Sequence, residues 1–300
     1  MKEILIDQVV TSHNLMKNKV TKLDQPIELF EKDVWVENGF FYLSKTGRPA
    51  TGRLTHHQDN GNVAIRLNVQ RGLLHGLWEE FFENGDLSYW CNFSNGKKGL
   101  YDESYDEYGW LTSSNCWLDG ELHGVRKSWI KGRLDREEEY RYGKRHGLTQ
   151  YFGLPLVTRF RGRYVNGEPD GWHVSRYDNN KTKKEYHWDN GVRTDRWRSF
   201  YECGQLEHEY FYDNGVLSGE SRSYFDNGVL GMITKFENGK QHGVTYLYHP
   251  NGKLKISRQY KNGMLDGVER MFNVDQSLSS EIVWDGGKKI SEVSYLWSGA

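Results

Sequence analysis

The chain has 300 residues, with 40 Lys and Arg against 41 Asp and Glu, and a formal net charge of −1. This balance supports neither a direct nucleic-acid partner nor a polyacidic tail. Thirty-three glycines, 11 Trp and 19 Tyr beside only 5 prolines favour β structure, in which aromatic rings supply the buried area.

Residues 1–37 precede any repeat, and we predict that they cap the first hairpin. The opening MKEILIDQVVTSHNLMKNKV carries Glu3 and Asp7 within its short apolar run, so it lacks the 7–15 apolar residues of a signal peptide. No window reaches the roughly 18 apolar residues of a membrane span. The three cysteines are too few and too scattered for a disulfide framework. We therefore expect a reduced, cytoplasmic protein.

The predicted repeat domain is 38–290: a 24-residue rhythm occupies about residues 52–290, after a partial first hairpin at 38–47. One glycine, called the marker glycine, recurs at intervals of 23, 24 or 48 residues. The two intervals of 48 place Leu100 and Asp195 where a marker is missing, which gives about ten repeats. The marker glycines are Gly52, Gly76, Gly124, Gly147, Gly171, Gly219, Gly243 and Gly267.

Two further glycine turns lie within each repeat, so each repeat is predicted to hold two strands. Asn-Gly occurs at 238–239, 251–252 and 262–263. This dipeptide is typical of the two-residue type I′ turn, which needs positive φ at both central positions. The turns are therefore predicted to connect the successive strands of a long series of hairpins.

Aromatic and leucine columns set the expected register. Aromatic residues recur five positions after the marker, and leucines recur two positions after the first turn. Polar residues fill the alternate positions, which predicts one buried and one wet face. The predicted fold is all-β: an elongated, twisted antiparallel β-meander or solenoid of hairpin repeats, closed by a last strand at 291–300. The two columns include Phe81, Phe200, Tyr224, Tyr248 and Phe272, and Leu87, Leu206, Leu230, Leu254 and Leu278.

DGELHGVRKSW (119–129), GKRHGLTQYF (143–152) and NGKQHGVTYLYHPNGKL (238–254) resemble MORN repeats, most closely the bacterial YwqK-type antitoxin variant. The opening FYLSKTGRPATGRL (41–54) is also similar to that group. The resemblance implies antiparallel hairpin ribbons that bind partners. Bacterial members are assigned as antitoxin or immunity proteins, and eukaryotic members are linked to membranes and scaffolding. The turns near 153–158 and 179–182 depart from the pattern.

Catalytic, metal and cofactor sites are not expected. His75, His123, His146 and His242 each precede a marker glycine, but neighbouring repeats lie about 10 Å apart, too far to share a zinc ion. We interpret them as turn residues of the repeat. No zinc-protease, nucleophile-elbow, phosphate-loop or C-x-x-C motif occurs. The chain is therefore not expected to be an enzyme.

Charge is distributed unevenly along the sequence. Residues 76–123 hold ten acidic residues and two lysines, whereas 141–198 hold thirteen Lys and Arg and six acidic residues. This pattern indicates either an ordinary solvent-exposed surface of varied charge or a ribbon with one acidic and one basic region that orients a charged partner. Trp90 and Phe211 fall at wet-face positions, as interface anchors or as ordinary exposed rings. The candidate partner-binding residues are Glu79, Glu80, Trp90, Glu103, Glu107, Arg145, Arg159, Arg161, Arg163 and Phe211.

Two functions follow as expectations from the resemblance and the charges. The first is an antitoxin or immunity protein that occludes the active or substrate-binding surface of a cognate toxin. The second is a scaffold or membrane-peripheral protein that uses the basic middle repeats to bind anionic lipid or another protein.

Overall fold

The computed structural model describes residues 27–154 and 157–295. They form strands, turns and one short 3-10 helix, so the predicted all-β class is confirmed. The chain divides into two compact units, residues 1–109 (unit 1) and 110–300 (unit 2), which are described separately. Within the described residues, no helix is long and apolar enough to cross a membrane.

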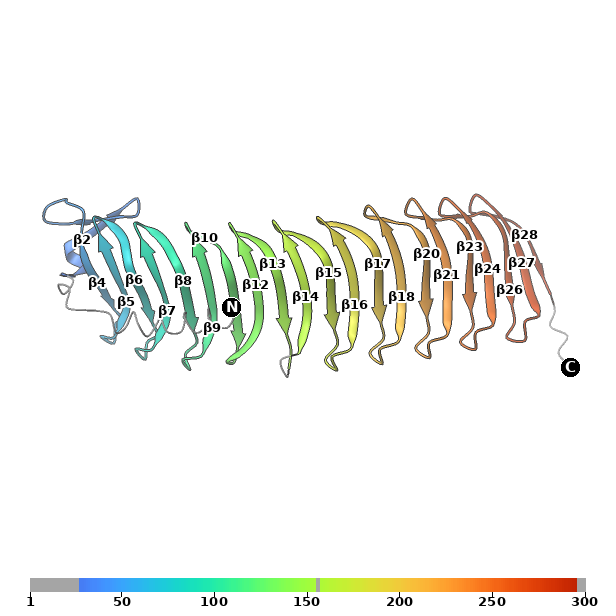
Figure 1. Cartoon of the computed structure of the whole chain (residues 1–300), viewed down its shortest axis with the longest axis horizontal. Helices are drawn as coiled ribbons and strands as arrows, with labels where there is room; N and C mark the ends of the chain where they lie inside the picture. Colours follow the sequence, from blue (N-terminus) through green and yellow to red (C-terminus); the bar gives the residue numbers. More distant parts are fainter. Residues whose placement is uncertain (1–26, 155–156, 296–300) are drawn as a thin grey trace, which may run out of the picture. The chain divides into compact units, whose positions relative to one another are not determined.

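Unit 1 is a five-stranded antiparallel meander, β4 to β8, with a small hairpin beside it (Figure 1). Its elements are β1 (Glu28–Leu29), η1 (Glu31–Asp33), β2 (Val34–Glu37), β3 (Phe40–Leu43), β4 (Gly52–His57), β5 (Val63–Gln70), β6 (Leu73–Phe81), β7 (Leu87–Ser94) and β8 (Lys97–Tyr105).

The segment before the meander covers the edge of β4. Strand β1 pairs with β4 in parallel, and the Arg53 N–H donates to the Ile27 carbonyl at 2.8 Å. Leu29 is buried with Ala50, Leu67 and Val69 in an apolar cluster. These contacts are compatible with a cap at 1–37, but residues 1–26 of that prediction lie outside the described residues, as do 296–300 of the predicted closing strand.

Unit 2 is built from antiparallel hairpins of the same kind. Neighbouring strands pair antiparallel from β9 to β28. Where a strand is interrupted, its short first part and its longer second part pair with the same neighbour, as β19 and β20 both pair with β18. The strands are β9 (Leu111–Leu118), β10 (Glu121–Leu122), β11 (Gly124–Ile130), β12 (Arg133–Arg141), β13 (Lys144–Phe152), β14 (Thr158–Val165), β15 (Glu168–Arg176), β16 (Thr182–Asp189), β17 (Val192–Phe200), β18 (Leu206–Asp213), β19 (Val216–Leu217), β20 (Gly219–Tyr224), β21 (Leu230–Glu237), β22 (Lys240–Gln241), β23 (Gly243–Tyr248), β24 (Leu254–Lys261), β25 (Met264–Leu265), β26 (Gly267–Phe272), β27 (Leu278–Asp285) and β28 (Lys288–Ser294).

The glycine turns fall into two classes. Asn238 and Gly239 have φ of 51° and 77°, as the predicted type I′ turn requires, and the turn at 262–263 is alike. At 251–252 the type I′ prediction is wrong, because only Gly252 has positive φ. There the His249 N–H donates to the Lys253 carbonyl at 2.8 Å and closes a three-residue loop, whose last residue is the left-handed glycine.

Most type I′ turns are tied to the preceding repeat. The N–H of the turn glycine donates to a carbonyl 21 or 22 residues earlier, as from Gly239 to Leu217 at 3.0 Å, Gly263 to Gln241 at 2.8 Å and Gly287 to Leu265 at 2.8 Å. Side chains link loops of the other class, as where the Tyr201 hydroxyl donates to the Tyr224 carbonyl at 2.8 Å. Turns of both classes therefore carry hydrogen bonds between repeats.

The marker positions are β-bulges. In β13, the register against β12 shifts on either side of Gly147, which has φ of 112°. Asp195, where the marker glycine is missing, keeps φ of 59° in the corresponding bulge of β17. Aspartate accepts this left-handed conformation better than most residues, because its short polar side chain bonds locally. The bulge thus belongs to the repeat even where glycine does not.

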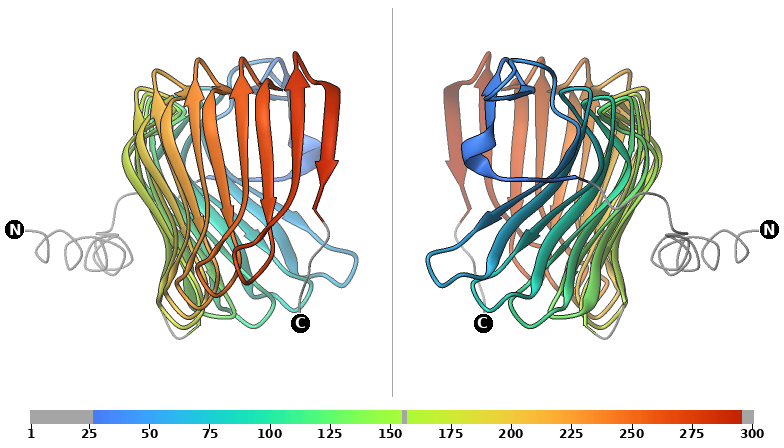
Figure 2. Two further views of the ribbon diagram at one scale, coloured as in Figure 1. Left: turned by 90° about the vertical axis from the view of Figure 1, so that its right-hand side faces the viewer. Right: turned by 90° about the vertical axis from the view of Figure 1, so that its left-hand side faces the viewer.

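A second set of bulges recurs at the aromatic column. The register shifts between Ser199 and Phe200 and at the equivalent place in later repeats. Bulges bend strands, and the strands of unit 2 are bowed (Figure 2). Just beyond each bulge the two predicted columns meet, since an aromatic residue lies opposite a leucine. These pairs are Phe81–Leu87, Phe200–Leu206, Tyr224–Leu230, Tyr248–Leu254 and Phe272–Leu278.

We call the face that carries Tyr164, Trp188 and Tyr212 the ring face, and the opposite face, where Arg198 lies beside Phe200, the charged face. In unit 2 the ring face buries small polar residues more than apolar ones, among them Thr149, Ser221 and Thr234. Thr234 and Thr245 share a hydrogen bond of 2.6 Å between their hydroxyls. Burial here depends on the surrounding rings and on local hydrogen bonds rather than on an aliphatic core.

His173 lies in the ring face of unit 2 with an exposed fraction of 2%. Its imidazole packs against the rings of Phe160, Tyr164 and Tyr186 at centroid distances of 5.2–5.7 Å. Nε2 lies 2.8 Å from the Arg163 carbonyl. Desolvation lowers the pKa of His173. The hydrogen bond to the Arg163 carbonyl and the charge of Asp170 raise this pKa, but by less.

Stability is therefore expected to fall on acidification. Because the folded pKa lies below the unfolded value of about 6.5, the unfolded chain binds the extra proton. The contribution of His173 is complete above pH 6.5 and is lost as the pH falls toward the folded pKa, with a slope of at most about 1.4 kcal/mol per pH unit. Urea unfolding between pH 8 and pH 5 measures this slope. In His173→Gln the slope should be smaller than in the wild type, and an unchanged slope would contradict the assignment.

Candidate binding surface

The charged face of unit 1 contains a row of four side chains from four successive strands. Arg66 of β5 lies opposite Glu79 of β6, Glu79 opposite Trp90 of β7, and Trp90 opposite Glu103 of β8. The Arg66 guanidinium lies 3.3 Å from the Glu79 carboxylate, and the Trp90 indole N–H donates to Glu103 at 2.8 Å. This row joins three predicted site residues: Glu79, Trp90 and Glu103.

Glu103 is an acceptor for three aromatic side chains. Besides Trp90, which donates to Oε2, the Tyr101 hydroxyl donates to Oε1 at 3.2 Å and the Tyr105 hydroxyl donates to Oε2. Desolvation and this hydrogen bond raise the pKa of Tyr105. The Glu103 carboxylate therefore holds the Trp90 and tyrosine side chains in place as well as contributing charge.

Two other predicted residues lie away from this row. Glu80 faces the ring face, where it accepts the Trp78 indole N–H at 2.8 Å. Glu107 is exposed in the turn after β8. Of the predicted acidic residues of unit 1, only Glu79 and Glu103 therefore share a face in a strand row.

The charged face of unit 2 carries an alternating ladder of charges. Glu185 lies opposite Arg198, Arg198 opposite Glu209, and Glu209 opposite Arg222 on four consecutive major strands. Arg198 forms an ion pair with Glu185, and Arg196 forms one with Glu209 at 3.4 Å. Most of the charge in this stretch is thus neutralised within the sheet.

The predicted arginines are divided between the two faces. Arg159, Arg161 and Arg163 alternate along β14 with ring-face residues and are exposed on the charged face. Arg159 pairs with Asp178 at 2.8 Å and Arg163 with Asp170 at 3.6 Å. Arg145 instead lies on the ring face, where its guanidinium meets the buried Glu138 at 2.7 Å and lies 5.5 Å from the Tyr164 ring.

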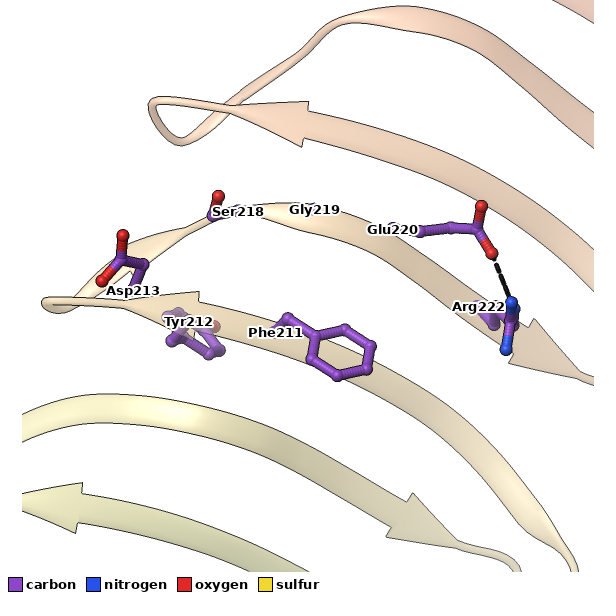
Figure 3. Close-up of a pocket in the computed structure, with 7 residues that line it drawn as sticks. All are labelled: Phe211, Tyr212, Asp213, Ser218, Gly219, Glu220 and Arg222. Carbon is purple, nitrogen blue, oxygen red and sulfur yellow. Dashed lines mark hydrogen bonds and ion pairs between the residues drawn. The ribbon is translucent and has the colours of Figure 1, made fainter.

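Phe211 borders a hollow of about 540 Å³ on the charged face of unit 2 (Figure 3). The hollow lies where the strand is interrupted between β19 and β20, and the Ser218 N–H there donates to the Phe211 carbonyl at 2.9 Å. The Arg196 guanidinium lies 5.3 Å from the Phe211 ring, and Glu220 pairs with Arg222 at 2.6 Å. Phe211 therefore presents an apolar ring among paired charges.

A second hollow, of about 520 Å³, was not predicted from the sequence. It lies beside Arg161 and includes the side chains of Arg176 and Gln150. Arg176 is 15 positions from Arg161 and Gln150 is 11, spacings that bring them together only through the cross-strand register. The full lining is Gln150, Val157, Thr158, Arg161, Val174, Arg176 and Asn180.

The repeat histidines contact turns. The turn N–H groups of Asn95 and Asn166 donate to Nδ1 of His75 and His146, at 3.5 and 3.4 Å. Within the described residues, no group of three or more His, Cys, Asp or Glu side chains is placed to hold a metal ion.

Two segments match a family model, the MORN repeat variant. They are residues 74–95 and 241–262, one in each unit. Both span the marker bulge, the loop after it and the following strand. Repeats of this kind are commonly binding modules for proteins or lipids.

The comparisons with whole proteins add little. We found no curated protein similar to this chain. The chain is similar to a chain in the crystal structure of TcdB2-TccC3-Cdc42, with 11% identity and a TM-score of 0.19 over 78% of this chain and 15% of that chain. For TcdB2-TccC3-TEV the identity is 10% and the TM-score 0.17, over 82% and 14%. At these scores the likeness carries no argument.

Proposed function

We propose that this chain is a non-catalytic repeat protein that neutralises a cognate toxin by covering its active or substrate-binding surface. The observation that carries the proposal is the charged face of β14. Three arginines, Arg159, Arg161 and Arg163, lie there at alternate positions with exposed side chains, the first and third of them in ion pairs. Such a row suits an acidic surface on a protein partner, because complementary potentials speed association and exclude wrong partners.

The two MORN-variant segments support a binding role. Trp90 and Phe211 are proposed anchors at the charged faces of their own units, since rings among polar groups are frequent hot spots. Glu79 and Glu103 are proposed to contribute negative charge beside Trp90.

The test begins with the partner recovered from the native host by affinity purification and identified by mass spectrometry. Replacing Arg159, Arg161 and Arg163 together by glutamate should weaken its binding by about 100-fold, because like charges then face each other. Biolayer interferometry measures the affinity for the partner. Growth of cells that co-express the partner with each variant measures protection from the toxin.

The control replaces three exposed lysines elsewhere in unit 2, Lys253, Lys255 and Lys261, by glutamate, which changes the net charge equally. This variant should bind within about threefold of the wild type at 0.15 M salt, where distant surface charges are screened. A partner without toxic activity would overturn the antitoxin role. Sedimentation of the wild type with anionic vesicles, lost at raised salt, would instead favour the scaffold or membrane-peripheral function.

A further inference from the structure

The second hollow of unit 2 has an unusual balance of charge. Two guanidinium groups, Arg161 and Arg176, line it, and no acidic residue is among its described lining. Elsewhere on this face arginines have carboxylate partners, as in Arg222–Glu220 at 2.6 Å and Arg270–Glu281 at 2.8 Å. Among the residues that the structure describes, neither Arg161 nor Arg176 forms an ion pair.

The carboxylates nearest to this hollow in the strand register are already engaged. Glu137, opposite Gln150, pairs with Lys127 at 3.4 Å. Glu185, opposite Val174, pairs with Arg198. Two like charges that share one hollow repel each other, and this cost is offset when an anion lies between them.

The neighbouring groups add neutral hydrogen-bonding capacity. Gln150, Arg161 and Val174 lie opposite one another on β13, β14 and β15, so the Gln150 amide and the Arg161 guanidinium share a face. Thr158 supplies a hydroxyl at the start of β14, and Asn180 supplies a side-chain amide from the turn before β16.

One of the two arginines is held in place by the backbone. The Arg176 side chain donates through Nη1 to the Asn180 carbonyl at 3.1 Å. The Asn180 turn is itself closed, because the Tyr177 N–H donates to the Lys181 carbonyl at 2.9 Å. A guanidinium has five N–H donors, so this bond leaves donors for a ligand.

We propose that this hollow binds a phosphate group, either free or carried as a monoester. A phosphate ester carries a charge close to −2 at pH 7, which matches two guanidinium groups, whereas one carboxylate would leave a positive charge uncompensated. Arginine forks and a hydroxyl are suited to a tetrahedral oxyanion with several acceptor oxygens. The site goes beyond the proposed function, since it names a ligand chemistry that toxin binding does not require.

Isothermal titration calorimetry on the full chain tests the site with inorganic phosphate, O-phosphoserine in a short peptide, and acetate, at constant ionic strength. Phosphate and the phosphopeptide should bind and acetate should bind at least tenfold more weakly. Tighter binding of the phosphopeptide would assign a protein-borne phosphate, and equal binding would assign a free one; both support the site. Acetate binding as tight as phosphate binding would overturn it.

Variants locate the binding. Arg161→Gln and Arg176→Gln should each weaken phosphate binding at least tenfold, whereas Arg270→Gln, which removes a paired arginine of the same face, should leave it unchanged. Circular dichroism checks that each variant keeps its fold. Unchanged phosphate binding in both Arg161→Gln and Arg176→Gln would refute the site, whatever the outcome with the toxin partner.

The pH dependence adds a readout that a general surface charge would not give. The phosphate of O-phosphoserine loses one negative charge as the pH falls below about 6, whereas sulfate stays a dianion. Binding of the phosphopeptide should therefore weaken several-fold from pH 7.5 to pH 5.5, and sulfate binding should not. Parallel losses for the two anions would contradict recognition of the dianion.

Discussion

Glu269→Ala is expected to lower the free energy of unfolding by about 3 kcal/mol. Glu269 lies on the ring face of β26 with an exposed fraction of 4%. Its carboxylate accepts the Trp284 indole N–H at 2.9 Å and lies 3.6 Å from the Arg258 guanidinium. Truncation leaves the half-buried Arg258 guanidinium and the Trp284 indole N–H without their acceptor. Leaving these groups unpaired costs more free energy than the intact ion pair contributes to stability.

The matched control is Glu281→Ala on the neighbouring strand β27. Glu281 pairs with Arg270 at 2.8 Å on the charged face, where the Arg270 side chain is 48% exposed. Water replaces such a partner, so the expected loss is about 0–1 kcal/mol. Urea unfolding followed by tryptophan fluorescence compares the two variants. Equal losses would show that the ring face of this hairpin is no more buried than its charged face.

Gly162→Ala is expected to destabilise unit 2 by about 1–3 kcal/mol. A Cβ on Gly162 would lie 2.7 Å from Nδ1 of His173, and this imidazole is confined by the rings of Phe160, Tyr164 and Tyr186. Gly162 has no positive φ, so the effect is one of space rather than of backbone conformation. The strand has to shift or the histidine has to leave its cage.

Gly231 provides the comparison. It is also a strand glycine without positive φ, but a Cβ there would lie at an ordinary 3.4 Å from the Phe225 ring. Gly231→Ala is expected to be neutral or to stabilise by up to about 1 kcal/mol, because alanine restricts the unfolded chain. The difference between the two thermal midpoints tests the cage around His173. A Gly162→Ala variant as stable as Gly231→Ala would contradict it.

The repeat rhythm was predictable because it depends on local chemistry. Glycine and asparagine fix the type I′ turns, and the spacing of Tyr224, Tyr248 and Phe272 fixes the register, which the pairing with leucines confirms. The turn at 251–252 was mispredicted because Asn-Gly also fits the end of a three-residue loop. Dipeptide identity alone does not count the residues between the flanking strands.

The candidate site was less predictable because charge was counted along the sequence. Adjacent residues of a strand face opposite sides, so Glu79 and Glu80 cannot belong to one surface. Arg145 was grouped with Arg159, although it lies on the ring face and pairs with Glu138. A spacing of 13 residues brings partners together across a hairpin, as in Glu79 with Arg66 and Glu103 with Trp90. Analysis by this register would have found the neutralised charges and the unmatched Arg161.

The bond from a type I′ turn to the carbonyl of the previous repeat has a genetic consequence. Because the donor and the acceptor keep the same distance along the chain from one repeat to the next, duplication or loss of one whole 24-residue segment in the regular part of unit 2 would reconnect the same atoms. A cut whose length is not a multiple of 24 residues would misalign them. Such a gene can lengthen or shorten its product by recombination while each surviving hairpin keeps its neighbours.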